Sequence, residues 1–167
     1  MGRWSYSSRN TVEDCLTLSI FSLRQDNVLW AGCLWTSTWK NRLGEERSSI
    51  GGATETGPDA DLRIRLTYTQ TDRISCKVKE ELEYTIDLTE TPCNFGNKRY
   101  WFLCPVSNCG RRVGKLYLPP RAKLFGCRMC YDLTYQSCRD SNTKFARLLK
   151  LGGGRKHWEK WLKELNT

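Results

Sequence analysis

Four of the nine cysteines in this 167-residue chain fall into two close pairs. Cys104 and Cys109 stand in the segment Cys-Pro-Val-Ser-Asn-Cys-Gly, and Cys127 and Cys130 stand in Cys-Arg-Met-Cys-Tyr, with 17 residues between Cys109 and Cys127. Two short cysteine loops separated by the length of a hairpin supply the four thiolates that a tetrahedral Zn²⁺ ion requires. The pattern therefore predicts a zinc ribbon with these four side chains as the metal ligands.

Four thiolates fill every position of a tetrahedral zinc ion, so we expect the metal to be structural. A structural zinc site in a small peptide contributes an apparent ~10 to 16 kcal/mol near neutral pH, which would dominate the stability of a ribbon with little core. Iron, in a cluster or in a rubredoxin-like site, uses the same ligand set and is an alternative. Cys93 and Cys138 lie nearer the ribbon than the remaining cysteines and are alternative ligands, although neither has a partner at the required spacing.

The cellular compartment follows from the cysteines and from hydropathy. Nine is an odd number for a disulfide framework, so thiolate ligation under reducing conditions explains the cysteines better. No stretch approaches the ~18 consecutive apolar residues of a membrane span, and the N-terminus has no apolar signal-peptide core. We expect a cytoplasmic protein that does not engage a membrane.

Hydrophobic periodicity predicts the fold of the first half. Apolar residues recur at helical spacing over 12–24, which predicts a helix there, and Trp30–Trp39 has the aromatic and β-branched composition of a strand. Alternating apolar and polar residues over 62–68 and 84–88 predict two further strands, joined in an antiparallel meander that packs on the first helix. The pair Gly51-Gly52 predicts a break or bulge in the intervening extended segment.

The second half is expected to combine the ribbon with helices. Residues 112–118 and 124–126 are suited to the strands of the ribbon. Residues 139–150 and 155–166 are predicted to form two basic amphipathic helices, separated by three consecutive glycines.

Turn-forming residues cluster at 92–97, where the charge of the chain also changes sign, and mark the predicted domain boundary. We therefore predict an α+β protein of three parts. An N-terminal helix and an antiparallel β-meander occupy residues 1–97, the four-cysteine zinc ribbon occupies residues 98–138, and basic C-terminal helices occupy residues 139–167.

The formal net charge of +9 is distributed unevenly. Residues 1–97 hold 11 Lys and Arg against 14 Asp and Glu, whereas residues 98–167 hold 16 against 4, a net charge of +12. A field of one sign attracts polyanions, nucleic acid first and acidic membranes second, and a basic surface kept for solubility is the alternative. The predicted nucleic-acid contacts, to DNA or RNA, are the cations around the metal and in the C-terminal helices: Arg111, Arg112, Lys115, Lys123, Arg128, Arg139, Lys144, Arg147, Arg155 and Lys156.

The chain has few residues in patterns that are typical of enzyme active sites. Its single histidine, His157, argues against paired-histidine nucleases, a His-ligated catalytic zinc ion and a Ser-His-Asp triad. The carboxylates are spread along the first half without a motif that gathers them, and the glycine run 152–154 follows a predicted helix instead of a strand. We expect no enzymatic activity.

Six segments carry a resemblance: Thr-Val-Glu-Asp-Cys-Leu at 11–16, Thr-Pro-Cys-Asn-Phe-Gly at 91–96, Arg-Tyr-Trp-Phe-Leu-Cys-Pro at 99–105, Cys-Gly-Arg-Arg-Val at 109–113, Lys-Leu-Tyr-Leu-Pro at 115–119 and Cys-Arg-Met-Cys-Tyr-Asp-Leu-Thr-Tyr-Gln-Ser at 127–137. Together they resemble a family of uncharacterised bacterial zinc-ribbon proteins often found on mobile elements. The resemblance implies a ribbon and a bacterial, phage or plasmid setting, and it implies no particular activity.

These features predict a non-catalytic zinc-ribbon protein that binds the phosphate backbone of nucleic acid through its basic C-terminal half. The alternative is a protein-interaction module, such as a small subunit or inhibitor of a larger nucleoprotein complex of the mobile-element, phage or CRISPR type.

Overall fold

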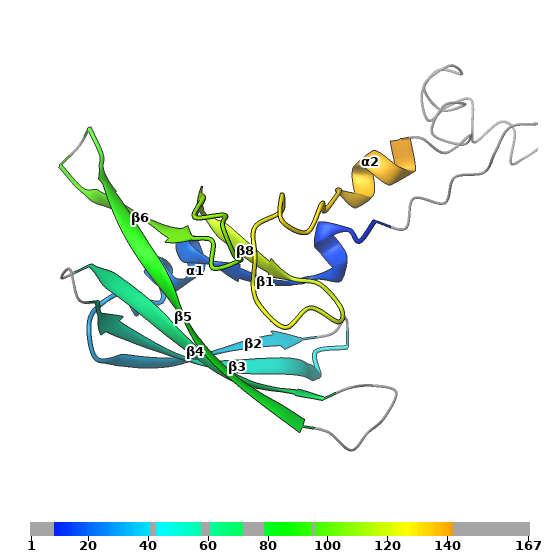
Figure 1. The fold of residues 1–167 in the computed structure, drawn as a ribbon, viewed down its shortest axis with the longest axis horizontal. Coiled ribbons are helices and arrows are strands. Elements are labelled where there is room, and N and C mark those ends of the chain that lie inside the picture. Colours follow the sequence, from blue (N-terminus) through cyan, green and yellow to red (C-terminus); the bar gives the residue numbers. More distant parts are fainter. Residues whose placement is uncertain (1–8, 41–42, 58–60, 72–78, 95, 142–167) are drawn as a thin grey trace, which may run out of the picture.

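The computed structural model of the chain describes residues 9–40, 43–57, 61–71, 79–94 and 96–141, and this part is mostly β-strand (Figure 1). The strands are β1 (Leu16–Ser19), β2 (Cys33–Lys40), β3 (Glu46–Thr56), β4 (Leu62–Thr71), β5 (Lys79–Pro92), β6 (Lys98–Leu103), β7 (Arg112–Val113) and β8 (Lys115–Leu118). The helical elements are the 3-10 turn η1 (Val12–Asp14) and the short helices α1 (Ile20–Gln25) and α2 (Gln136–Ser141). The prediction of an α+β fold is therefore wrong.

Six strands form one antiparallel sheet in the chain order β2-β3-β4-β5-β6-β7, and β1 and β8 form a separate antiparallel pair. The strand β5 belongs to both halves of the large sheet, because its first part pairs with β4 and its last part, from Leu88 to Pro92, pairs with β6. Figure 1 shows the large sheet curling along this long strand. The predicted antiparallel meander of residues 62–68 and 84–88 is confirmed, with Ile64 opposite Ile86.

The core is one apolar cluster that joins both sheets. Ile86 and Phe102 come from the large sheet and Leu116 from β8, and all three are fully buried. Cys104 and Cys127 belong to the same cluster, so two of the predicted metal ligands are continuous with the core. The division of the chain at residue 97 stays a prediction, and β5 and β6 pair across that position.

The predicted helix over 12–24 is wrong for most of its length. A 3-10 turn occupies Val12–Asp14, Leu16–Ser19 forms β1, and only Ile20–Gln25 is α-helical. Residues 16–19 form their backbone hydrogen bonds with β8 as a strand, in place of the bonds within the segment that a helix would form. Leu16 belongs to the helical spacing, but Leu16 and Leu18 are two residues apart, which fits a strand equally well.

The glycine pair in β3 does not interrupt the strand, contrary to the prediction. Gly51 and Gly52 pair in register with Thr36 and Trp35 of β2, and the irregularity in this pair of strands falls instead next to Lys40. A Cβ atom on Gly52 would lie 2.2 Å from the indole of Trp35, so the glycine makes room for this ring.

The second half also differs from the prediction. Residues 112–118 are divided at Gly114 into β7 and β8, which belong to different sheets, and residues 124–126 contribute a single bridge between Gly126 and Tyr117. The described fold is a β-sheet protein and not one built on basic C-terminal helices, contrary to the prediction. Of the predicted helical residues 139–167, the structure describes only 139–141, in α2, and the remainder lies outside the described residues. Neither described α-helix has the length and apolar content needed to cross a membrane.

Candidate metal centre

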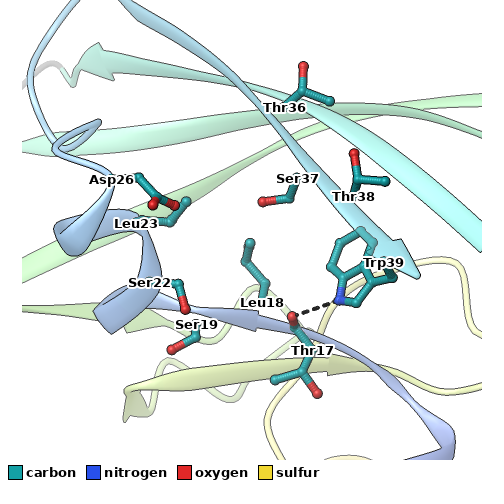
Figure 2. Close-up of a pocket in the computed structure, with 10 residues that line it drawn as sticks. All are labelled: Thr17, Leu18, Ser19, Ser22, Leu23, Asp26, Thr36, Ser37, Thr38 and Trp39. Carbon is teal, nitrogen blue, oxygen red and sulfur yellow. Dashed lines mark hydrogen bonds between the residues drawn. The ribbon is translucent and has the colours of Figure 1, made fainter. Parts of the chain in front are cut away.

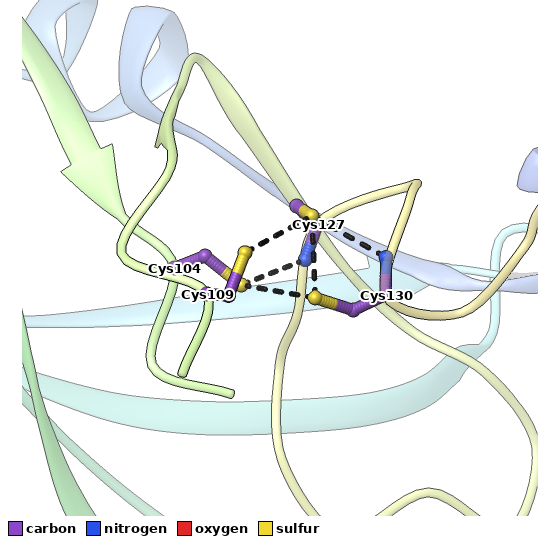
Figure 3. Close-up of side chains that lie close together, drawn as sticks. All are labelled: Cys104, Cys109, Cys127 and Cys130. Atoms are coloured by element: carbon purple, nitrogen blue, oxygen red, sulfur yellow. Dashed lines mark hydrogen bonds between the residues drawn. The ribbon is translucent and has the colours of Figure 1, made fainter. Parts of the chain in front are cut away.

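The four cysteines of the two predicted knuckles meet in space, as Figure 3 shows. All four Sγ atoms lie within 4.8 Å of one another. The Cys104–Cys130 pair is separated by 3.9 Å, the Cys109–Cys127 pair by 3.8 Å and the Cys127–Cys130 pair by 3.5 Å. Four sulfurs at 2.3 Å from a tetrahedral zinc ion are about 3.8 Å apart, so this donor set fits such an ion. All four are free thiols with no disulfide among them.

The first knuckle begins directly after β6. The N–H of Cys104 donates to the carbonyl of Arg111 at 3.0 Å, and the N–H of Cys109 donates to the carbonyl of Val106 at 3.0 Å. The turn passes through two residues of positive φ, Asn108 at 62° and Gly110 at 54°. Asparagine and glycine tolerate this conformation best, which explains why they flank the second ligand.

The second knuckle is fixed by hydrogen bonds to sulfur. The N–H of Cys127 donates to Sγ of Cys104 at 3.2 Å, and the N–H of Cys130 donates to Sγ of Cys127 at 3.4 Å. Gly126 precedes the third ligand because a Cβ there would lie 2.6 Å from Val106 and 2.7 Å from Tyr131. Such amide-to-sulfur bonds orient the ligands and stabilise thiolates.

The pKa values of the cluster cysteines are shifted in opposite directions. The N–H of Arg111, donating to sulfur, is the main cause that lowers the pKa of Cys109 to about 7. Burial raises the pKa values of Cys104 and Cys130 above the ordinary range of a thiol. A metal cation stabilises the thiolate form of all four, and four thiolates leave a tetrahedral ion no open position.

The remaining described cysteines lie outside this cluster. Cys93 and Cys138, the alternative ligands, are not among the four side chains that meet. Cys15 donates to the carbonyl of Thr11 at 3.2 Å, and burial raises the pKa of its thiol to about 11, so it is held in the protonated form.

Three of the predicted nucleic-acid contacts follow the first knuckle within six residues of Cys109 in the chain. Arg111 follows the turn of Gly110, Arg112 begins β7, and Lys115 begins β8, and all three side chains are exposed. None of the described carboxylates lies within ion-pair distance of them. We call these three exposed residues, which follow Cys109 in the chain, the cationic group Arg111–Arg112–Lys115.

The other predicted contacts are dispersed or already engaged. Lys123 forms an ion pair with Glu80 at 2.8 Å, and the guanidinium of Arg128 lies 5.1 Å from the ring centre of Tyr135. Arg139 is exposed on α2. Four predicted contacts lie outside the described residues: Lys144, Arg147, Arg155 and Lys156.

A further cationic feature was missed in the sequence. Arg99 stacks on two rings, with its Cζ atom 4.5 Å from the centre of Trp101 and 5.4 Å from that of Phe21. Arg99 and Trp101 are two residues apart on β6, so a strand prediction would have placed them on one face. The contact with Phe21, from α1, carries no sequence signal.

A separate pocket of about 280 Å³ lies between β1, α1 and β2 (Figure 2). Its wall is rich in hydroxyl groups, with Asp26 at one side, and the indole N–H of Trp39 donates to the carbonyl of Thr17 at 3.1 Å. None of the cluster cysteines lines it. The pocket and the metal centre are thus distinct.

The described fold and its cysteine cluster define a mostly β protein with a four-thiolate site that can hold a metal ion. No family model, no curated protein and no solved structure matches the chain.

Proposed function

We propose that the protein is a non-catalytic nucleic-acid-binding protein, in which a structural Zn²⁺ ion on Cys104, Cys109, Cys127 and Cys130 fixes a cationic surface. The observation that carries the proposal is the exposure of Arg111, Arg112 and Lys115, which follow Cys109 of the cysteine cluster within six residues. Zinc holds the two knuckles together and thereby sets the path of the chain from Gly110 into β7 and β8.

The charge of this region supports a polyanion as the partner. Residues 98–139 contain nine Lys and Arg and one Asp. Two of these cations are neutralised by carboxylates of β5, in the pairs Lys98–Glu90 and Lys123–Glu80. The group Arg111–Arg112–Lys115 keeps its charge free among the described residues, which is what contact with a phosphate backbone requires.

The test is the salt dependence of binding. Fluorescence anisotropy with a labelled DNA and a labelled RNA oligonucleotide should give affinities that fall steeply with salt. Reversing Arg111, Arg112 and Lys115 to Glu should reduce the slope of log K against log salt by about 2 to 3, since each lost duplex phosphate contact accounts for about 0.9. Lys40→Glu is the matched control, because this exposed cation lies on β2, at the opposite edge of the large sheet.

Two results would refute the proposal. One is an affinity for DNA and RNA that does not change with salt, and the other is a triple reversal with the same affinity as the Lys40→Glu control. Both variants must retain one metal ion per chain for the comparison to count.

A second candidate is a protein-interaction module, and the start of β2 favours it. Leu34 is 81% exposed and Trp30 is 55% exposed, and β2 is an edge strand of the large sheet. Exposed apolar side chains beside the edge strand of the described sheet suit a protein partner. A stoichiometric complex that survives nuclease treatment, together with no binding of naked oligonucleotides, would favour this function over the first.

A further inference from the structure

The side chains of Phe21, Arg99 and Trp101 form a single, partly exposed cluster, which we call the stacking cluster. The guanidinium of Arg99 lies over both rings, at 4.5 Å from the centre of Trp101 and 5.4 Å from that of Phe21. Phe21 is 41% exposed. Gly114 lies beneath the rings, because a Cβ there would be 2.8 Å from Phe21 and 3.8 Å from Trp101.

The stacking cluster shares one face of β6 and β7 with Arg112, a member of the cationic group. Phe102 faces the core and pairs with Val113, so its neighbours Trp101 and Leu103 point to the opposite face. Arg112 pairs with Leu103 and therefore shares that outer face. The indole N–H of Trp101 donates to the hydroxyl of Thr91 at 2.9 Å, on the strand next to β6, which holds the ring in place.

The stacked geometry leaves Arg99 able to bind an anion. A guanidinium stacked on aromatic rings uses its faces, and its N–H donors at the edge stay available to phosphate oxygens. None of the described carboxylates forms an ion pair with Arg99 or Arg112. The two charges are therefore oriented by the fold and not neutralised by the described residues.

The exposed ring of Phe21 lies beside cations that form no ion pair with the described residues, and this arrangement favours single strands over duplexes. An unpaired base can stack on an aromatic side chain, whereas the bases of a duplex are already stacked inside the helix. A duplex would use only the cations and would gain nothing from Phe21.

We propose that the stacking cluster, continued by Arg112, binds single-stranded nucleic acid, with Arg99 and Arg112 on phosphates and Phe21 against an unpaired base. This inference rests on the proposed function and names the class of nucleic acid. The competing role is purely structural, with Arg99 acting as a cation that fastens α1 to β6.

The experiment compares a labelled single strand of about 20 nucleotides with a duplex of the same sequence, at one salt concentration, by anisotropy. The wild-type protein is expected to prefer the single strand. Phe21→Ala should weaken single-strand binding roughly 5- to 150-fold, the range of one lost base–aromatic stack, and leave duplex binding within about twofold. Trp30→Ala is the matched control, since this aromatic residue is 55% exposed and lies outside the cluster.

Arg99→Lys is the second variant, which keeps the charge and removes the planar, stacked donor group. It should lower single-strand affinity selectively, with the circular dichroism spectrum and the metal content of the wild type. If Phe21→Ala does not fold, the single-strand and duplex affinities of Arg99→Lys test the stacking cluster instead.

The outcomes separate the two proposals. If the wild type binds neither single strands nor duplexes, the proposed function itself fails. If it binds both but without preference, or if Phe21→Ala and Arg99→Lys weaken both forms equally or neither form, only the stacking cluster is refuted.

Discussion

The hydroxyl of Tyr84 accepts a hydrogen bond from the backbone N–H of Phe125 at 2.8 Å. Tyr84 belongs to β5, and Phe125 lies two residues before the third cysteine of the cluster. The Phe125 ring is fully buried, stacks on Trp39 with ring centres 6.2 Å apart, and meets Tyr68 edge-on at 6.1 Å. The large sheet therefore holds the segment that brings Cys127 into the cysteine cluster.

This contact predicts the effect of Tyr84→Phe. The substitution removes the acceptor and leaves the buried N–H of Phe125 without a partner, at a cost of ~1 to 3 kcal/mol of unfolding free energy. Urea denaturation of the metal-loaded protein should show a lower midpoint with an unchanged slope. Tyr100→Phe is the control, because the Tyr100 hydroxyl makes no hydrogen bond to the described residues, and equal losses in both variants would contradict the role of Tyr84.

The neighbouring tyrosines Tyr68 and Tyr84 predict lower stability of the fold at alkaline pH. Burial, followed by its hydrogen bond with Tyr68, raises the pKa of Tyr84 well above its ordinary value, and burial also raises the pKa of Tyr68. Above about pH 10 the unfolded chain loses phenolic protons that the folded chain retains, so the free energy of unfolding is fully present below about pH 10 and falls above it. The fall should be shallower in Tyr84→Phe, measured by urea denaturation at a series of pH values, and an identical fall in both proteins would exclude Tyr84 as its source.

The strands with one buried and one exposed face were predictable from sequence, and β1 was not. In β4 and β5 the alternation of side chains is regular over many residues, which only a strand explains. Leu16–Ser19 is too short to distinguish the helical period of about 3.6 residues from the strand period of two. Its partner strand, Lys115–Leu118, lies about a hundred residues further along the chain. Tertiary pairing therefore overrode the local helical pattern.

The ligand set of the candidate site was predictable because it is local. Each knuckle is a short loop, and the spacing of its cysteines follows from the geometry of one metal ion. The supporting contacts were not predictable, because Tyr84 and Phe125 are 41 residues apart and neither residue type indicates the other. The contact of Phe21 with Arg99 was also not predictable, because the two residues are far apart in sequence and meet only where α1 packs beside β6.

The two adjacent glycines of β3 give a matched pair of variants. A Cβ on Gly52 would overlap the Trp35 ring at 2.2 Å, whereas a Cβ on Gly51 would meet only the carbonyl of Thr67 at an ordinary 3.5 Å. Gly52→Ala should therefore lower the unfolding free energy by ~1 to 3 kcal/mol through overpacking. Gly51→Ala should leave it unchanged or raise it by up to about 1 kcal/mol. Thermal and urea unfolding would check both, and similar losses would show that Trp35 is not the cause.

The cysteine cluster predicts which thiols retain the metal. Elemental analysis of the purified protein should find one Zn²⁺ ion per chain, and Cys109→Ser should lose it, because a tetrahedral site with three thiolates binds far more weakly. Cys33→Ser and Cys93→Ser should keep the full metal content, since neither thiol belongs to the cluster. Metal loss in either control, or full retention in Cys109→Ser, would contradict the assignment.

Removal of the metal should release the N-terminal segment. The N–H of Val12 donates to the carbonyl of Thr134 at 2.9 Å, and the N–H of Thr134 donates to the carbonyl of Asn10 at 3.2 Å. Thr134 lies four residues after Cys130, so the second knuckle fixes the partner on which these bonds depend. Hydrogen exchange after chelation should become faster at Val12 and Thr134, while the amide of Ile64, in the middle of the large sheet, should remain protected. If Val12 and Thr134 kept their protection without metal, the second knuckle would fold independently of the ion, and the structural role assigned to zinc would be wrong.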